Sequence, residues 1–243
     1  MSEDRYTSPL VERYAGRAMA ARFSPMARAR AWRRAWIALA EAEHELGGPV
    51  SAEQVEALRA TAAQIDLARI AEHEAITRHD VMAHVHAWGE ICPVGAPILH
   101  LAATSCFVTD NADGVIQREG LEGLRERLVQ LTRALAKLAE READQPTLGY
   151  THFQPAQPVT AGKRVGLWLQ DVVADLLDLD RFLREFPCRG AKGTTGTQAS
   201  FLALFGGDLA KVRELDQKIA TKLGFPASVP LSGQTTPRKL EAR

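Results

Sequence analysis

Two long stretches of regularly spaced apolar residues constrain the fold of this chain more than any other feature of its sequence. In each stretch the apolar residues alternate spacings of three and four, which is the pattern of a heptad seam along one face of a helix. We expect the first helix to run from about Asn111, and the second to begin at Pro158 after a break at Gln145-Pro146. Such helices indicate a bundle, and their seams need cover from further helices of the same chain or of other subunits. The first seam comprises Leu121, Leu124, Leu128, Leu131, Leu135 and Leu138, and the second comprises Val165, Leu169, Val172, Leu176, Leu179, Leu183 and Phe186.

Shorter helices are expected before these two. Ser24 followed by Pro25 is typical of a helix start, because serine caps free backbone N–H groups and proline suits the first turn. Ser51 and Gln54 have the spacing of a capping box at the start of the next helix, whose apolar stripe is expected to continue through Val55, Leu58, Ala62 and Ile65. Since no run of alternating β-branched residues is convincing, the predicted fold class is all-α, with at most short strands.

The change in helix length suggests two parts. We predict an N-terminal helical domain over residues 1–110, followed over residues 111–243 by the first part of a central helical-bundle domain. Thr236-Pro237 indicates one more helix start, yet only Arg238 to Arg243 follow it. We therefore expect the chain to be a truncated, N-terminal part of a longer protein.

Composition excludes several classes of function. The 30 Lys and Arg residues balance the 30 Asp and Glu residues, so nothing favours a nucleic acid or a membrane surface as partner. No apolar stretch approaches the roughly 20 residues of a membrane helix, and the N-terminus has no apolar signal region, so we expect a cytoplasmic protein. Cys92, Cys106 and Cys188 are far apart and odd in number, which argues against a disulfide framework and a thiolate zinc site.

Four polar clusters near the ends of expected elements could carry chemistry. Five of the seven histidines fall in them, and histidine suits general acid or base work because its pKa lies close to neutrality. A single polar histidine is nevertheless more often a satisfied structural group. The clusters are Arg5 to Ser8, Arg78 to Asp80 with His84 and His86, His100 with Thr104 and Ser105, and Thr151 to Gln154.

Two other readings of polar segments are disfavoured. The side chains of His79, His84 and His86 cannot converge on a metal from one helix, because the step from His79 to His84 turns the side chain about 140° away. The segment Gly190 to Gln198 has the composition of a phosphate loop, but it lacks Walker spacing and an evident preceding strand. We expect it to be a turn between helices that could still present backbone N–H groups to an anion.

Taken together, six motifs resemble the adenylosuccinate lyase family, a branch of the fumarase/aspartase superfamily. The match runs from about Arg5 to Lys239, and several motifs of eight or more residues in the same order make it specific. The motifs are Arg5-Tyr-Thr-Ser-Pro-Leu, Arg78-His-Asp-Val-Met-Ala-His-Val-His, His100-Leu-Ala-Ala-Thr-Ser-Cys, Gly149-Tyr-Thr-His-Phe-Gln-Pro-Ala-Gln, Lys192-Gly-Thr-Thr-Gly-Thr-Gln-Ala-Ser-Phe and Ser232-Gly-Gln-Thr.

This resemblance implies a β-elimination that releases fumarate, from adenylosuccinate to give AMP and from succinyl-carboxamide imidazole ribotide. No metal or organic cofactor is implied. Such a reaction needs a base for a carbon-bound proton, donors for the charge that develops on a carboxylate, and an acid for the departing nitrogen. By resemblance His152 is that acid, and His79, beside an aspartate that favours imidazolium, is the alternative. The implied substrate-binding residues are Arg5, Tyr6, Arg78, His79 and Asp80 at the nucleotide end, Thr104, Ser105 and Thr151 at the carboxylates, and Gln234.

One departure from the family is serious. Its catalytic base is a serine on a Ser-Ser-x-Met-Pro-x-Lys loop, which these 243 residues do not contain, so we expect the chain alone to be inactive. Family members are homotetramers whose sites combine several subunits, and a complete protein is expected to assemble likewise. Two alternatives remain: another lyase of the superfamily, such as argininosuccinate lyase, or a non-catalytic helical scaffold that binds partner helices.

Overall fold

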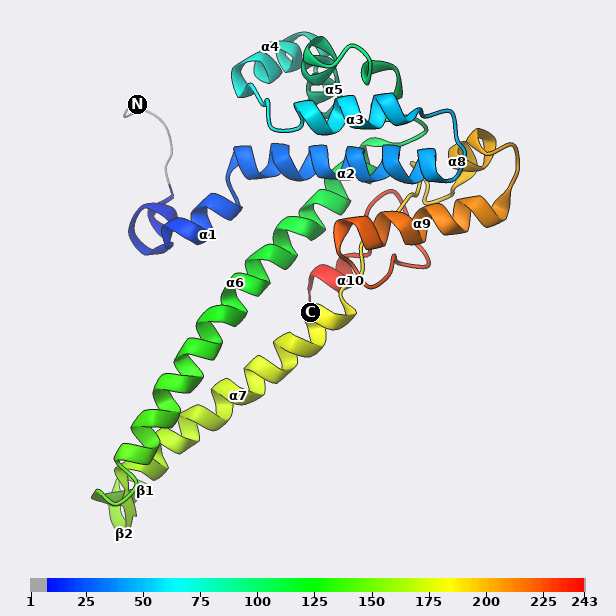
Figure 1. Ribbon diagram of the computed structural model, residues 1–243. Helices are drawn as coiled ribbons and strands as arrows, with labels where there is room; N and C mark the ends of the chain where they lie inside the picture. The colour runs from blue at the N-terminus through cyan, green and yellow to red at the C-terminus, as the bar shows by residue number, and fades with distance from the viewer. Residues whose placement is uncertain (1–7, 243) are drawn as a thin grey trace. The chain divides into compact units, whose positions relative to one another are not determined.

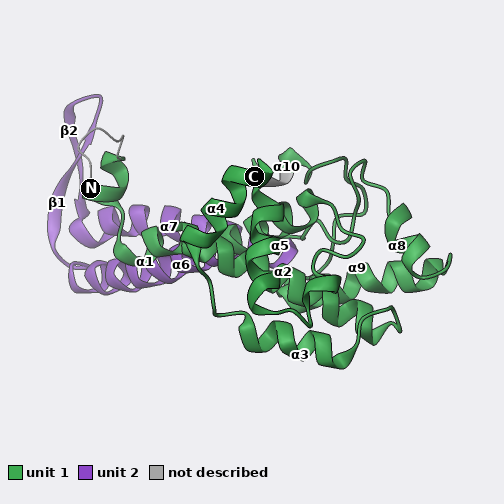
Figure 2. Cartoon of the chain, turned by 90° about the horizontal axis from the view of Figure 1, so that it is seen from above, with its two compact units in different colours: residues 1–118, 186–243 green, residues 119–185 purple. Residues whose placement is uncertain are grey.

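A computed structural model describes residues 8–242, which form a predominantly helical chain (Figure 1). The fold class is therefore confirmed as mainly helical, with one small two-stranded sheet in addition. The chain divides into two compact units, one of residues 1–118 with 186–243 and the other of residues 119–185 (Figure 2). These two units are defined by the compactness of the chain and are not the two domains expected from the sequence. The domain boundary at residue 110 therefore stays a prediction. Within the described part of the chain, no helix combines the length and apolar character that a membrane crossing needs.

The first unit consists of short and medium helices that lead into and out of the second. Its elements are a π-helix (Leu10–Tyr14), α1 (Arg17–Arg22), α2 (Pro25–Glu45), α3 (Ala52–Thr61), α4 (Leu67–Thr77), α5 (Asp80–Ile91), a short 3-10 helix (Ala96–Ile98), the beginning of α6 (Ser105–Arg141), α8 (Ala199–Leu204), α9 (Leu209–Leu223) and α10 (Arg238–Glu241).

Helix α2 is the centre of this unit. It begins as predicted, with the Ser24 hydroxyl accepting from the backbone N–H of Ala27 and Pro25 in the first turn. Trp32, Trp36 and Leu39 are buried along it, and α3 and α9 pack against it. Because α2 is covered on several sides, its apolar residues supply much of the unit's hydrophobic stabilisation.

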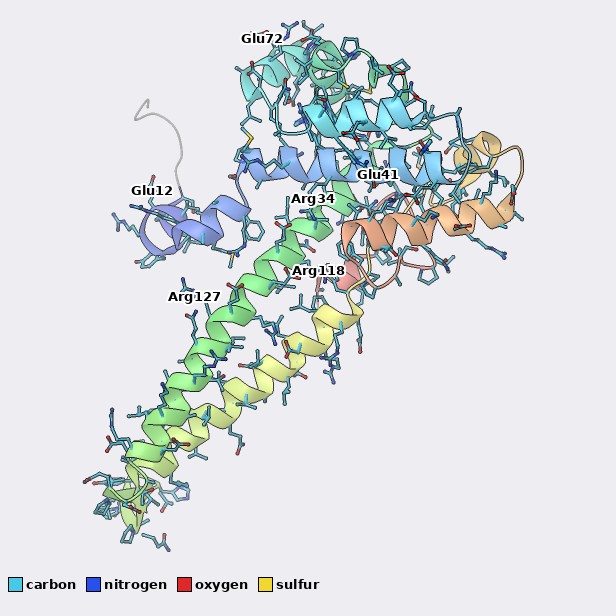
Figure 3. The ribbon with its side chains drawn as sticks, in the orientation of Figure 1. Glu12, Arg34, Glu41, Glu72, Arg118 and Arg127 are labelled. Carbon is cyan, nitrogen blue, oxygen red and sulfur yellow. The ribbon has the colours of Figure 1, made fainter. Side chains whose placement is uncertain are left out.

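Charged side chains reinforce the packing around the end of α2. Glu41, labelled in Figure 3, accepts from Arg59 of α3 at 2.6 Å and from Lys222 of α9 at 2.9 Å. Glu45 binds Lys222 and Lys218, and the hydrogen bond from Lys222 is the main cause that lowers the pKa of this carboxyl. These pairs are partly exposed to solvent, which weakens each of them, so they orient the helices more than they stabilise them.

Helix α3 starts as predicted and ends earlier than predicted. Ser51 and Gln54 form both bonds of the capping box. The apolar stripe was expected to continue to Ile65, but the helix ends at Thr61, whose hydroxyl bonds back to the carbonyl of Ala57. The residues that follow, to Asp66, form turns that lead to α4.

A buried polar network holds the chain where it returns from α7 to the first unit. Gly190, with φ of 78°, exchanges both backbone hydrogen bonds with the side chain of Asn111, and a Cβ there would collide with Asp216. Asp216 accepts from the N–H of Ala191 at 2.6 Å and from Lys192 Nζ at 2.7 Å. The segment from Gly190 to Gln198 is a turn between helices, as predicted.

The second unit is a pair of antiparallel helices joined by a hairpin. It comprises the rest of α6, strands β1 (Pro146–Thr151) and β2 (Gln154–Thr160), and α7 (Ala161–Glu185). At Gly162 the helices approach so closely that a Cβ would collide with the backbone of Ala139. Arg125 and Asp180 pair at 2.5 Å between them.

Two expected starts in these helices were wrong. Helix α6 begins at Ser105, six residues before Asn111, because the buried residues Phe107 and Val108 extend its apolar face ahead of the leucine-rich part. Helix α7 begins at Ala161 and not at Pro158, because residues up to Thr160 pair with β1.

The helix start expected at the end of the chain also differs from the prediction. Pro237, and not Thr236, occupies the N-cap position of α10, and no side chain caps that helix. The backbone N–H of Thr236 donates to Asp110 at 2.5 Å. This bond ties the segment before α10 to α6.

The apolar seams of the second unit are incompletely covered. Leu124 keeps 46% of its surface exposed and Leu131 keeps 45%, whereas Val165 near the hairpin is buried. Trp168 and Leu177 of α7 are exposed as well. The two helices therefore do not satisfy each other's apolar faces.

Glu43 is a buried carboxyl in the middle of the apolar surroundings of α2. Its residue exposure is 0%, and neither carboxylate oxygen has a hydrogen-bond partner among the described residues. Burial therefore raises the pKa of Glu43 from 4.5 to about 8, so this side chain is mainly protonated at neutral pH.

We predict that Glu43 makes the folded first unit less stable as the pH rises. A raised folded-state pKa stabilises fully below the unfolded value of 4.5, and this contribution is lost as the pH rises through about 8. Glu43→Gln should remove the dependence and raise the free energy of unfolding at pH 8 by about 1–3 kcal/mol. Urea unfolding, followed by tryptophan fluorescence at pH 5 and pH 8, measures it. Glu126→Gln, at an exposed position of α6, is the control. Equal pH dependence of Glu43→Gln and the original chain would contradict the prediction.

We also predict that Asp216 is required because it neutralises a buried lysine. Asp216→Asn keeps an oxygen for Ala191 but leaves Lys192 Nζ without its counter-charge, which should cost about 3–5 kcal/mol of unfolding free energy. Adding Lys192→Met should recover a substantial part of the loss. Denaturant unfolding of both variants tests this, with Asp171→Asn at an exposed position of α7 as the control. The idea fails if Asp216→Asn stays within about 0.5 kcal/mol of the original chain.

Candidate active site

The first group of candidate residues lies where α4 ends and α5 begins. Arg78 terminates α4 in the left-handed region, with φ of 54°, and is exposed. His79 is the N-cap of α5, since its Nδ1 accepts from the backbone N–H of Met82 at 3.4 Å. Asp80 accepts from the N–H of Val81 at 2.8 Å and lies 3.4 Å from Arg28. Capping therefore fixes the direction of both the imidazole and the carboxylate.

His79 reaches the start of α6. Its Nε2 lies 3.3 Å from the hydroxyl of Ser105, the first residue of that helix. Its Nδ1 lies 3.5 Å from Asp80 Oδ1, a contact that attracts only the protonated ring. The side chain thus has a partner on each side, and its Nδ1 can accept from Met82 only while that atom carries no proton.

Thr104 extends this group toward the segment after α7. Its hydroxyl lies 3.2 Å from that of Thr194 in the Gly/Thr-rich turn. Thr104, Ser105 and His79 therefore lie close together, although the resemblance assigned Thr104 and Ser105 to the carboxylates and His79 to the nucleotide end. The resemblance gave Thr194 no role. Uncharged donors of this kind can hold a carboxylate without quenching its charge.

Gln234 belongs to the same side of the first unit through a buried arginine. Arg189, with Nε left unpaired, donates from Nη2 to the carbonyls of Gly193, Gly233 and Gln234 at 2.9–3.1 Å. Burial lowers the pKa of Arg189, and the charge of Asp110 is the largest influence acting against that. The guanidinium group thereby joins the Gly/Thr-rich turn to the Ser232-Gly-Gln-Thr segment.

His100 is a residue of this region to which the sequence assigned no role. It has φ of 65°, and its Nδ1 accepts from the indole N–H of Trp36 at 3.0 Å. Burial, and secondarily His79, lowers the pKa of His100 to about 4. Its position four residues before Thr104 in a polar cluster was the available signal.

A cavity of about 460 Å³ lies on another side of Asp80. Arg28 stacks over Trp32 in its wall, and the ring of His84 lies 4.5 Å from that of Trp32. Burial, with Arg28 and Arg33 nearby, lowers the pKa of His84 to about 4. His86 instead stacks on His73 at 5.7 Å, so His79, His84 and His86 have different neighbours. Among residues 8–242, no group of three or more His, Cys, Asp or Glu side chains is arranged to hold a metal ion.

Thr151 and His152 lie in the second unit, at the tip of the hairpin. His152 and Phe153 form its two-residue turn with φ of 47° and 60°, and such a turn suits the twist of a hairpin but usually takes asparagine and glycine. Positive φ in two residues with side chains costs on the order of 1–3 kcal/mol each. Phe153 is 100% exposed, and Thr151 and His152 are exposed too. Arg5 and Tyr6 lie outside the described residues.

Comparison with known proteins gives these residues a context. A family model described as Lyase matches residues 19–236. The adenylosuccinate lyase of Saccharomyces cerevisiae is 49% identical over 241 residues, which are 98% of this chain and 50% of that protein. The adenylosuccinate lyase of Schizosaccharomyces pombe is 46% identical over 97% of this chain and 50% of its own length.

Solved structures agree on the fold. The 3-carboxy-cis,cis-muconate lactonizing enzyme of Pseudomonas putida has a TM-score of 0.79 at 24% identity, over 95% of this chain and 52% of that one. The fumarate lyase of Mesorhizobium sp. BNC1 also has a TM-score of 0.79 at 24% identity, over 94% of this chain and 52% of that one.

The chain spans about half the length of the curated relatives that it matches. The family model covers most of the chain, and the relatives agree with the branch that the sequence motifs indicate. The chain therefore belongs to the lyase family, and within it resembles adenylosuccinate lyase.

Proposed function

We propose that this chain is the N-terminal part of an adenylosuccinate lyase, a carbon–nitrogen lyase of purine nucleotide synthesis. The observation that carries the proposal is 43–49% identity to three proteins of that name over 97–98% of the chain. Its substrates are then adenylosuccinate and succinyl-carboxamide imidazole ribotide. A cytoplasmic location is part of the same proposal.

The reaction is an elimination in which a base removes a carbon-bound proton, the electron pair forms the double bond of fumarate, and the carbon–nitrogen bond breaks. The departing nitrogen then needs a proton, and we assign that role to His152. Support comes from its place in the hairpin turn, where the side chain is exposed and available to a substrate. The base lies on a loop that these residues do not contain.

The carboxylates of the succinyl group are assigned to Thr104, Ser105 and Thr151. Thr104 and Ser105 are supported by their position at the start of α6, where the helix N-terminus favours negative charge. Neutral hydroxyls stabilise the charge that grows on a carboxylate during proton removal without trapping the ground state.

The nucleotide end is assigned to Arg5, Tyr6, Arg78, His79 and Asp80, and Gln234 to substrate contact. Arg78 is exposed at the end of α4, so its fork of donors is available to a phosphate. His79, beside Ser105, stays the alternative proton donor.

We also propose that the complete protein is a homotetramer in which other subunits cover the seams of α6 and α7. The incomplete burial of Leu124 and Leu131 supports this. Exposed apolar surface of this extent along two helices favours association in water.

We predict that, in a protein extended to the length of its relatives, substituting the proposed acid lowers turnover, whereas substituting a binding residue lowers affinity. His152→Ala should lower turnover by at least about 10²-fold with little effect on AMP affinity, because an acid acts only as the carbon–nitrogen bond breaks. Arg5→Ala should chiefly weaken binding. Fumarate release and direct AMP binding measure the two effects, and residues 1–243 alone should give no measurable turnover.

His44→Ala is the matched control for this experiment, because His44 is an exposed histidine whose ring bonds to the nearby Val50 carbonyl. Unchanged turnover in His152→Ala would remove the acid role from that residue. A larger loss in His79→Ala would move the role to His79. Turnover by residues 1–243 at a few per second or more would show that they include the base.

We further predict that the chain self-associates through its seams. Leu124→Gln should weaken self-association by at least about tenfold, because burying a leucine is worth about 1.5–3 kcal/mol. Leucine and glutamine have similar helix propensities, so α6 itself should persist. Sedimentation equilibrium measures the dissociation constant, with Leu231→Gln in an exposed segment as the control. A monodisperse monomer, or equal effects of the two substitutions, would refute the prediction.

A further inference from the structure

We propose that Trp36 is a positioning residue that fixes His100 in the Nε2–H tautomer, so that this ring presents one neutral N–H donor to an oxyanion of the substrate. The bond is 3.0 Å long, from indole Nε1 to imidazole Nδ1. An indole nitrogen only donates, so Nδ1 must accept with its lone pair. The proton of the neutral ring is therefore on Nε2.

The donor is held in the buried aromatic cluster of the first unit. Trp36 is 2% exposed on α2 and lies between Trp32, at 6.0 Å and 87°, and Trp88, at 6.1 Å and 53°. Its ring meets that of His100 edge to face at 6.0 Å and 82°. An indole packed on three sides cannot turn its N–H away without opening the core.

His100 is neutral for reasons that reinforce the hydrogen bond. Burial disfavours its charged form, and so does the neighbouring charge of His79. A proton on Nδ1 would in addition face the indole N–H, so Trp36 opposes protonation at that atom. A neutral donor keeps its charge state across the range in which an exposed histidine titrates.

This donor matters for the proposed function because His100 lies near the other candidate residues. The charge of His79 helps to lower the pKa of His100, and His79 itself contacts the Ser105 hydroxyl. A phosphate or carboxylate oxygen there can accept from Nε2 without any loss of a proton. The consequence for substrate rests on the proposed function, whereas the tautomer does not.

The first test is made on the 243-residue chain itself, labelled with ¹⁵N. Nuclear magnetic resonance should show a coupling through the hydrogen bond between Trp36 Nε1 and His100 Nδ1. The ring shifts should show Nδ1 unprotonated and Nε2 protonated from pH 5 to pH 8. His100→Gln identifies the signals. A proton on Nδ1, or a ring that titrates near pH 6.5, would overturn the proposal.

The second test compares Trp36→Phe with a matched variant, Trp88→Phe. Both tryptophans are nearly fully buried in the same cluster, and each indole N–H makes one hydrogen bond, that of Trp88 to the Thr61 hydroxyl at 2.9 Å. The two substitutions therefore remove similar packing and differ in the acceptor that is lost. Only Trp36→Phe should raise the pKa of His100 and mix its tautomers. Equal behaviour of His100 in both variants would mean that Trp36 merely packs. If Trp36→Phe does not fold, the coupling in the original chain still decides the question.

The consequence for substrate is tested in the protein extended to its relatives' length. Trp36→Phe should raise the KM for adenylosuccinate by about tenfold with a smaller effect on kcat, and Trp88→Phe should change KM by less than about twofold. Equal increases in KM would overturn the positioning role. If the extended protein without substitutions did not bind AMP, the proposed function would be refuted. The tautomer of His100 would still be decided by the nuclear magnetic resonance measurement.

Discussion

Burial of helix α2 is the interaction on which the first unit depends. Its tryptophans form a packed cluster with Trp88, and its other faces are covered by α3 and α9. Because aromatic rings bury large areas, this cluster both stabilises the unit and leaves few alternative arrangements. The same cluster extends to His100, so the core that holds the fold also holds a candidate site residue in one orientation. Glu43, without partners in that core, is the feature that opposes its stability at high pH.

A second constraint is the close approach of backbone segments that are far apart in the sequence. Asp216, Asn111 and Arg189 satisfy backbone groups that would otherwise be buried without hydrogen bonds. The glycine at 190 is required because a side chain there would occupy the place of Asp216. Polar side chains thus position the Gly/Thr-rich turn beside Thr104 and the segment of Gln234, and apolar packing alone would not define those positions.

The second unit has the opposite character. Its two helices meet through small residues and an ion pair, and they leave leucines of both seams partly exposed. The strained hairpin at its end presents His152 and Phe153 to solvent. A unit that exposes apolar faces along two helices is suited to association with other helices, which agrees with the proposed tetramer.

The sequence by itself determined the helical class, the starts of α2 and α3, and, through its motifs, the family to which the chain belongs. These features depend on local capping and periodicity, or on patterns that identify a family. Tertiary structure alone decided that residues 146–160 form a hairpin, that α6 begins at Ser105, and that Trp36 bonds to His100. Strand pairing and the bond to His100 join residues by their position in space, and the prolines and threonines of 146–160 carry no clear periodic signal. For the same reason no pattern in the sequence indicated that Arg189 would connect the turn at Gly193 to Gln234.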